Sequence, residues 1–144
     1  MKTKRHYAVP VFFGLLLTLF LFTGCSQNTK SGSQSNSKSG SYQQISSKEA
    51  AAMMEEEEDY LILDVRTPEE YEEAHIPEAV NVPNETIGTE EIPELPDKEQ
   101  LIFVYCRSGN RSKQASQKLA NLGYTNIIEF GGINDWKGDT VTGR

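Results

Sequence analysis

The segment Leu101–Tyr105, "LIFVY", is apolar at every position. A strand with one face in water alternates apolar and polar side chains, so an uninterrupted apolar run indicates a strand covered on both faces, as in a parallel sheet. Three further runs of β-forming residues have similar length: Tyr60–Asp64, Ala79–Pro83 and Asn126–Phe130. We therefore expect four strands, with Leu101–Tyr105 near the centre of the sheet.

Helix-start signals lie between these runs. Ser46 followed by Glu49 forms a capping box ahead of an alanine-rich segment, and Thr67 followed by Glu70 forms a second one. A third pattern places its apolar residues on one helix face and ends in a glycine: Ala115, Leu119, Leu122 and Gly123. Strands that alternate with helices predict an α/β fold, with a central parallel sheet and helices on both faces.

The chain of 144 residues, 37% of them hydrophobic, is long enough for one small domain. Its first 24 residues carry three positive charges and no acid, with an apolar run from Ala8 to Phe22. This layout is typical of an export signal peptide. Pro10 and Gly14 interrupt the run, and it is shorter than the roughly 20 residues of a spanning helix, so a permanent transmembrane helix is the weaker interpretation.

The signal ends in "LFTGCSQ", which resembles the lipobox of bacterial lipoproteins, although Phe22 replaces the usual leucine. By this resemblance, processing removes residues 1–24, and a lipid on Cys25 anchors the exported protein to the bacterial cell membrane with its domain on the extracytoplasmic side. Residues 26–41 hold no large apolar side chain. We therefore expect residues 25–41 to form a lipidated, flexible tether and residues 42–144 to form the domain.

The formal net charge is −7, and removal of the three positive charges in residues 1–24 makes it −10. A negative domain is repelled by nucleic acid and by anionic lipid, so we expect neither as its ligand. The acidic runs Glu55–Asp59 and Pro68–Glu73 are interpreted as solvated helix faces, because their spacing does not match a metal site. No metal is expected.

The apolar run ends at Cys106, where the loop "CRSGNRS" begins, and ligand sites lie at the carboxyl ends of parallel strands. A cysteine is nucleophilic as its thiolate, which helix N-termini and cationic side chains favour. Gly109 permits the positive φ that turns backbone N–H groups toward the sulfur, and Arg107 and Arg111 add positive charge. The loop therefore suits a thiolate that attacks an anionic, sulfur-bearing substrate.

Three stretches, taken in order, resemble one known family. They are "LILDVRTPEEYEEAHIPEAVNVP", which contains an Asp-x-Arg segment, the loop in "VYCRSGNRS", and the Gly-Gly segment in "GYTNIIEFGGINDWKG". On these motifs, nearly all of residues 42–144 resemble a single-domain rhodanese, which is a sulfurtransferase. Ala74 and Glu78 depart from the pattern, because the family more often has glycine at these positions.

The resemblance implies that Cys106 carries a persulfide and moves sulfane sulfur from a donor such as thiosulfate to a thiol or cyanide acceptor, with no cofactor. The loop would bind the sulfur through six residues: Arg107, Ser108, Gly109, Asn110, Arg111 and Ser112. Structural support would come from Asp64, Arg66 and His75. Arg66 would pair with Glu70 or Glu73, and a redox or sulfur-carrier protein is a candidate partner.

Two alternatives remain open. A rhodanese-like domain can serve as a non-catalytic binding module, although such domains commonly lack the cysteine that this chain has. A cysteine-dependent phosphatase or arsenate reductase needs five residues between its cysteine and its arginine, which would place the arginine at position 112, where this chain has Ser112. Arg111 instead closes a six-residue loop that begins at Cys106, and this tighter loop fits a sulfane sulfur better than a tetrahedral oxyanion.

Overall fold

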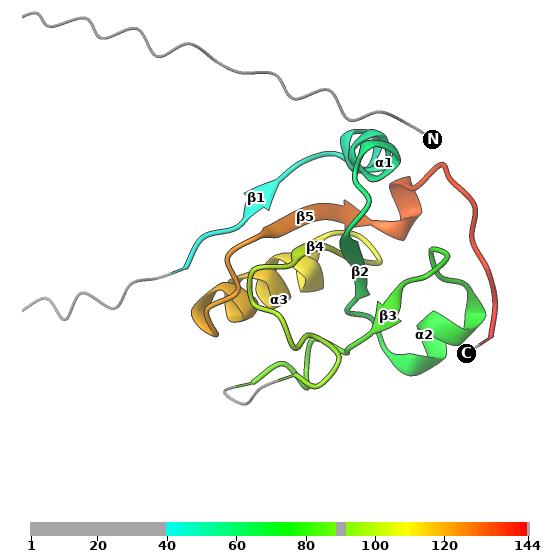
Figure 1. The fold of residues 1–144 in the computed structure, drawn as a ribbon. Helices are drawn as coiled ribbons and strands as arrows, with labels where there is room; N and C mark the ends of the chain where they lie inside the picture. Colours follow the sequence, from blue (N-terminus) through cyan, green and yellow to red (C-terminus); the bar gives the residue numbers. More distant parts are fainter. Residues whose placement is uncertain (1–39, 89–91, 144) are drawn as a thin grey trace, which may run out of the picture. The chain divides into compact units, whose positions relative to one another are not determined.

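The computed structural model describes residues 40–88 and 92–143. In this part of the chain, five parallel strands form one sheet in the order β1-β5-β4-β2-β3 (Figure 1). The bounds are β1 Gln43–Gln44, β2 Tyr60–Asp64, β3 Val80–Asn81, β4 Leu101–Cys106 and β5 Ile127–Gly132. The fully apolar strand β4 lies in the middle of the sheet, as its sequence predicts.

The sheet separates two hydrophobic cores, and Figure 1 shows α1 and α3 on its two sides. One core joins alternate residues of β4 to α3 (Asn110–Asn121): Ile102, Val104, Cys106, Ala115 and Leu119. The other core joins the remaining β4 residues to α1 (Ser47–Glu56): Phe103, Tyr105 and Ala50. Because both faces of the sheet are covered by helices, the predicted α/β architecture is confirmed.

Both predicted capping boxes form. The Ser46 hydroxyl accepts a hydrogen bond from the Glu49 amide at 3.2 Å, and the Glu49 carboxylate accepts one from the Ser46 amide at 2.8 Å. Thr67 and Glu70 make the same reciprocal pair at the start of α2 (Pro68–Glu73). Each box satisfies backbone donors that the first turn of a helix leaves without partners, so these sequence signals mark the true helix starts.

Only β2 has the predicted bounds: β4 extends one residue further, to Cys106, and β5 runs from Ile127 to Gly132 rather than from Asn126 to Phe130. β1 was not expected, because its two glutamines are polar and the segment is too short to show a periodic pattern. It forms because its backbone adds to the edge of β5 in parallel register. β3 is shorter than the predicted Ala79–Pro83, and after β5 the chain makes one 3₁₀ turn, η1 (Ile133–Asp135).

Among the described residues, Glu78 alone combines a side chain with a positive φ, of 65°. This is the left-handed region, which a residue with a Cβ occupies at a cost of roughly 1–2 kcal/mol. The resembling family more often has glycine at this position, and the backbone conformation supplies the physical reason. Glutamate in place of glycine at position 78 therefore strains the backbone of the turn between α2 and β3.

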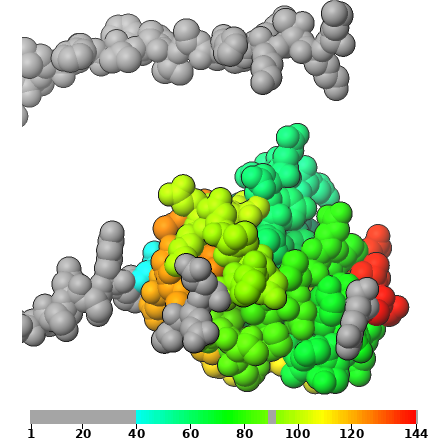
Figure 2. All heavy atoms as spheres, turned by 60° about the horizontal axis from the view of Figure 1, so that its bottom comes forward, coloured from blue at the N-terminus to red at the C-terminus, as the bar shows by residue number. Residues whose placement is uncertain are grey.

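The C-terminal residues return to α2 and close the domain there. His75 and Val141 exchange two backbone hydrogen bonds of 2.8 Å in an antiparallel bridge. The Gly143 amide donates to the Glu72 carbonyl at 2.9 Å. In Figure 2 the red C-terminal segment borders the green segment that contains α2.

The predicted signal peptide, Cys25 and the predicted tether up to residue 39 lie outside the described residues. Within the described part, none of the helices has both the length and the apolar character needed to cross a membrane.

Candidate active site

Cys106 is the last residue of β4, and a short loop connects it to α3. The Gly109 amide donates a hydrogen bond to Cys106 Sγ at 3.1 Å, and the positive φ of Gly109, 96°, turns this amide toward the sulfur. Ser112 Oγ lies 3.5 Å from the same sulfur. Because Cys106 is only 1% exposed, its sulfur is surrounded by protein groups.

The pKa of the Cys106 thiol lies below its ordinary value. Burial raises this pKa, but the hydrogen bond with the Ser112 side chain and those with the backbone amides of Ser112, Ser108 and Gly109 outweigh burial. The N-terminal end of α3 adds a positive partial charge at the same place. The loop thus favours the thiolate, as its sequence predicts.

Arg111, in the first turn of α3, forms a two-pronged ion pair with Glu70 of α2. Its Nη1 lies 2.6 Å from Glu70 Oε2 and its Nη2 lies 2.8 Å from Oε1. The hydrogen bond from Arg111 is the main cause that lowers the pKa of Glu70 to about 2. The pKa of Arg111 is raised in turn, first by Glu70 and in smaller part by the negative charge of Cys106. Arg111 therefore interacts electrostatically with both the carboxylate and the sulfur.

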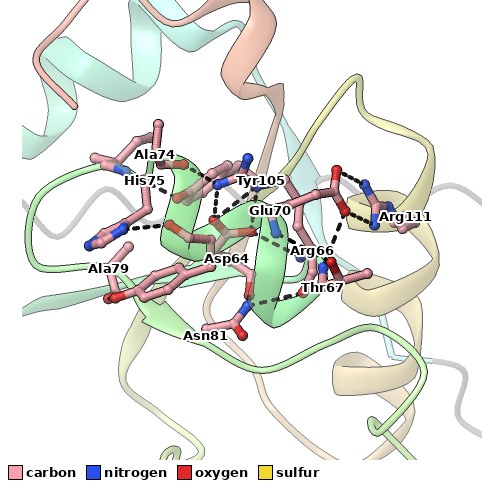
Figure 3. A network of polar contacts seen from close by, with 12 residues as sticks. Asp64, Arg66, Thr67, Glu70, Ala74, His75, Ala79, Asn81, Tyr105 and Arg111 are labelled. Carbon is pink, nitrogen blue, oxygen red and sulfur yellow. Dashed lines mark hydrogen bonds and ion pairs between the residues drawn. The ribbon is translucent and has the colours of Figure 1, made fainter. Parts of the chain in front are cut away.

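The prediction that Arg66 pairs with Glu70 or Glu73 is wrong. Arg66 is 5% exposed and donates to Asp64 from Nε at 2.9 Å and from Nη2 at 2.6 Å (Figure 3). Nη2 also donates to the Ala74 carbonyl at 2.6 Å. The fully buried carboxylate two residues earlier is thus the partner that compensates the buried guanidinium, and Glu70 stays available for the loop.

The Asp64–Arg66 pair braces the strand beside the site. Burial tends to lower the pKa of Arg66, but the hydrogen bond and the charge of Asp64 outweigh it, so the pKa of Arg66 is raised. Asn81 of β3 donates from Nδ2 to the carbonyls of Asp64 and Arg66, both at 3.0 Å. Since β2 pairs with β4, these contacts hold the carboxyl end of the sheet where Cys106 lies.

His75 lies two residues after the end of α2 and contacts Tyr71 of that helix. It is 6% exposed, and its Nδ1 lies 2.9 Å from the Tyr71 carbonyl oxygen. Its ring stacks on the Tyr71 ring with centroids 3.7 Å apart. The next residue, Ile76, donates from its amide to the Tyr105 hydroxyl at 3.2 Å, which ties this turn to β4. These contacts link the end of α2 to the turn that follows it, and the predicted structural role of His75 stays a prediction.

The rim of the loop is open to water, since Arg107, Ser108 and Asn110 are exposed. Asn110 begins α3, and only Gly109 has a positive φ in the loop. The Arg107 backbone packs directly on Gly132, where an added Cβ would lie 2.2 Å from the Arg107 carbonyl oxygen. The second glycine of "GGINDW" is therefore required by the shape of the loop.

Among the described residues, no group of three or more His, Cys, Asp or Glu side chains is placed to hold a metal ion. Glu129 of β5 is a buried acid near this site that was not among the residues expected from the sequence. Ser112 Oγ donates to Glu129 Oε1 at 2.5 Å, so Glu129 is joined to Cys106 through Ser112. The available signal was an acid inside the apolar run "NIIEF".

Residues 46–139 of the chain match the family described as the rhodanese-like domain. The chain belongs to this rhodanese-like family. It is 37% identical over 73 residues to the thiosulfate sulfurtransferase PspE of Escherichia coli (strain K12), a match that covers 51% of this chain and 70% of PspE. It is 35% identical over 114 residues to the putative sulfur carrier protein YrkF of Bacillus subtilis (strain 168), covering 77% of this chain and 60% of YrkF.

A solved structure agrees with this rhodanese assignment. The rhodanese with anions from E. coli matches with a TM-score of 0.54 at 36% identity, covering 58% of this chain and 99% of that one. The predicted rhodanese-like fold is therefore confirmed. At the level of enzyme class, the prediction of a rhodanese-type sulfurtransferase is confirmed as well.

Proposed function

We propose that this rhodanese transfers sulfane sulfur through a persulfide on Cys106. The observation that carries the proposal is the placement of Sγ, which accepts the Gly109 amide at 3.1 Å and lies 3.5 Å from the Ser112 hydroxyl. These groups stabilise negative charge at the base of the loop, first on the thiolate. After transfer, the charge moves outward onto the added sulfur, toward the exposed rim of the loop.

The two half-reactions balance without a cofactor. The Cys106 thiolate attacks the outer sulfur of a donor such as thiosulfate, an S–S bond forms, and sulfite leaves with the electron pair of the broken bond. An acceptor, a thiol or cyanide, then attacks the outer sulfur, and the thiolate leaves. Arg111 would attract the anionic donor, a role supported by its electrostatic interaction with Cys106.

The test is to mix the purified protein with thiosulfate and no acceptor, and to measure the intact mass. We expect a gain of one sulfur atom on Cys106, and its loss when cyanide is added. Cys106→Ser should keep the fold, by circular dichroism, and lose both the adduct and turnover, because a serine hydroxyl is not ionised in this loop. Turnover by Cys106→Ser above the uncatalysed rate, or the absence of any adduct on the parent, would refute the proposal.

We further propose that the protein is a lipoprotein held to the outside of the cell membrane through Cys25. The support is the sequence alone, namely the charged and apolar stretch that ends in Gly24 and Cys25. Cys25→Ala should move the protein from the detergent phase to the aqueous phase in a phase-partition experiment. If parent and variant partition equally, a lipid on Cys25 is not what holds the protein.

The names of the relatives guide the choice of donors and acceptors to assay. PspE is named as a thiosulfate sulfurtransferase and YrkF as a putative sulfur carrier protein. We propose thiosulfate as the first donor to test and a sulfur-carrier or redox protein as the class of physiological acceptor. This would be supported by an acceptor protein whose thiol takes up the outer sulfur of the Cys106 persulfide and gains no sulfur when mixed with Cys106→Ser.

A further inference from the structure

The arginine that closes the active-site loop faces two acids. Arg111 forms its two-pronged pair with Glu70 at 2.6 and 2.8 Å, beside the capping residue Thr67 (Figure 3). The pKa of Arg111 is raised first by the hydrogen bond with Glu70, and in smaller part by the charges of Cys106 and Glu85. A sulfur donor that approaches Arg111 therefore meets a positive charge that negative charges already accompany.

Glu70 is fixed in the position that this pairing requires. Its Oε2 also accepts from the Thr67 amide at 3.2 Å, in the capping box that begins α2. Its pKa of about 2, lowered chiefly by the hydrogen bond from Arg111, keeps the carboxylate ionised at neutral pH. The side chains of Glu70 and Arg111 are both 25% exposed, so the pair is partly open to solvent and to a ligand.

The pair offsets the charge of Arg111 without using all of its hydrogen-bond donors. A guanidinium has five N–H groups. Glu70 accepts from Nη1 and from Nη2, and no other acceptor in the described part of the chain is bonded to this guanidinium. Arg111 can thus still donate to an oxygen of a sulfur donor, whereas its net attraction for negative charge is reduced.

Arg111 is also the cation whose charge is coupled to the sulfur, because the negative charge of Cys106 contributes to its raised pKa after that of Glu70. Two other cations lie near the loop, Arg107 and Lys113. Both are exposed, and neither forms an ion pair with a described residue. Salt and water screen such exposed charges more strongly than those of a partly buried pair. The Glu70–Arg111 pair therefore acts most directly on a charged ligand at the sulfur.

We propose that Glu70 is a positioning residue that sets the preferred charge of the sulfur donor. By pairing with Arg111 it disfavours donors with two negative charges and favours donors with one, such as thiosulfonates and thiol persulfides. This preference rests on the persulfide scheme proposed above. With each donor, the Cys106 thiolate bonds to the outer sulfur, the S–S bond of the donor breaks, and the remnant leaves with the electron pair. The remnant is sulfite from thiosulfate, a sulfinate from a thiosulfonate and a thiolate from a persulfide.

The number of charges on the donor is the quantity that separates these classes. Thiosulfate carries two negative charges at neutral pH, whereas a thiosulfonate anion carries one. The energy between the donor and a charge of the protein is proportional to the charge of the donor. Removal of the Glu70 charge therefore favours the dianion about twice as much, in free energy, as it favours the monoanion.

The experiment compares thiosulfate with methanethiosulfonate, in which a methyl group replaces one oxygen and one charge is lost. With cyanide as acceptor at neutral pH, kcat/KM is measured for each donor in the parent and in Glu70→Gln, and circular dichroism checks the fold. We expect the ratio of kcat/KM, thiosulfate over methanethiosulfonate, to rise about threefold to tenfold in Glu70→Gln, chiefly through the KM for thiosulfate. A loop that is merely loosened would lose activity with both donors and keep the ratio. An unchanged or lower ratio would overturn the proposal.

Glu73→Gln is the matched control, because it removes one negative charge from the exposed end of the same helix and leaves the pair intact. Its ratio should stay within about twofold of the parent. An equal rise in Glu70→Gln and Glu73→Gln would show an effect of net charge alone and would overturn the proposal. Arg111→Gln is the second variant, since it leaves Glu70 without its cation. Its ratio should fall below that of the parent, and a ratio that does not fall would also overturn the proposal.

A binding measurement separates this inference from the persulfide scheme. Sulfate and methanesulfonate resemble the two donors but contain no sulfane sulfur to transfer. Each is tested for protection of Cys106 against iodoacetamide, an uncharged reagent for thiolates, in the full chain carrying Cys25→Ala so that one thiol remains. The ratio of the two binding constants, sulfate over methanesulfonate, should rise in Glu70→Gln as the kinetic ratio does.

The two ideas fail in different ways. If neither donor leaves a sulfur adduct on Cys106, the persulfide scheme fails, and the protection ratio still decides the role of Glu70. If adducts form but the protection ratio is the same in the parent and in Glu70→Gln, the role of Glu70 is refuted and the scheme stands. Absence of protection of Glu70→Gln by sulfate would refute the role of Glu70 as well.

Discussion

The ion pair between Glu70 and Arg111 connects α2 to the first turn of α3, just after the active-site loop. The variant Glu70→Gln removes the negative charge of this pair and tests what that charge contributes. Glutamine has the same shape, and its amide oxygen can still accept the Thr67 amide that Glu70 accepts at 3.2 Å. What it loses is the negative charge that faces Arg111 Nη1 at 2.6 Å and Nη2 at 2.8 Å. The variant therefore keeps the capping box of α2 and removes the ion pair.

The expected loss in the free energy of unfolding can be bounded from the pKa of Glu70, which falls from its ordinary 4.5 to about 2. A tenfold change in proton affinity is worth about 1.4 kcal/mol, so the upper bound is roughly 3 kcal/mol. Both side chains are 25% exposed, and solvent screens the pair. We therefore expect Glu70→Gln to lower the free energy of unfolding at neutral pH by about 1–2 kcal/mol.

The pH dependence gives the prediction its sign. The folded-state pKa of Glu70 is depressed, so its contribution to the free energy of unfolding is fully present above pH 4.5 and is lost as the pH falls toward about 2. The difference between parent and Glu70→Gln should shrink over the same range and vanish below it. Urea unfolding at several pH values, followed by the fluorescence of the single tryptophan, Trp136, measures this.

Glu73→Gln is the control, since Glu73 is an exposed acid at the end of the same helix. Its stability should stay within about 0.5 kcal/mol of the parent at every pH. Equal stability of Glu70→Gln and parent at neutral pH would show that the pair contributes nothing. A difference that stays constant down to pH 2 would show that its origin is not the charge of Glu70.

Three further predictions concern the loop and the strained turn. Glu78→Gly should raise the free energy of unfolding by about 1 kcal/mol in urea unfolding, because it relieves the φ of 65°; an unchanged or lower value would mean that the turn holds no strain. Arg111→Ala should raise the KM for thiosulfate and the pKa of the Cys106 thiol, while Arg111→Lys should restore part of both, and unchanged kinetics and pH profile would place Arg111 outside the site. Gly132→Ala should abolish turnover and lower stability by more than about 1 kcal/mol, because its Cβ would lie 2.2 Å from the Arg107 carbonyl oxygen; wild-type activity would show that the loop can shift.

Features with a local cause could be predicted from the sequence. The two capping boxes, the central position of Leu101–Tyr105 and the positive φ of Gly109 each depend on residues close in the chain. β1 could not be predicted, because its two glutamines become a strand only through the edge of β5, 85 residues away. Its backbone supplies the pairing, and its side chains carry no signal.

The pairing of charges could not be predicted either, because it depends on which side chains tertiary structure brings together. Arg66 was expected to pair with an acid of the following helix, yet its buried guanidinium pairs with the buried carboxylate of Asp64. Glu70 pairs instead with Arg111, which is 41 residues away. In the same way, the hydrogen bond between Ser112 and Glu129 depends on the packing of α3 against β5, whereas the sequence around Glu129 shows only an acid within an apolar strand.

The pairing of β1 with β5 also determines when this protein can fold during its synthesis. β1 is the earliest described strand, and its only neighbour in the sheet is β5, the latest one. A nascent chain therefore cannot complete its sheet until residue 132 has left the ribosome, and the large sequence separation of its paired strands makes folding slow. Under the export that we propose for this protein, such a delay would keep the domain open for translocation until its last strand has been made.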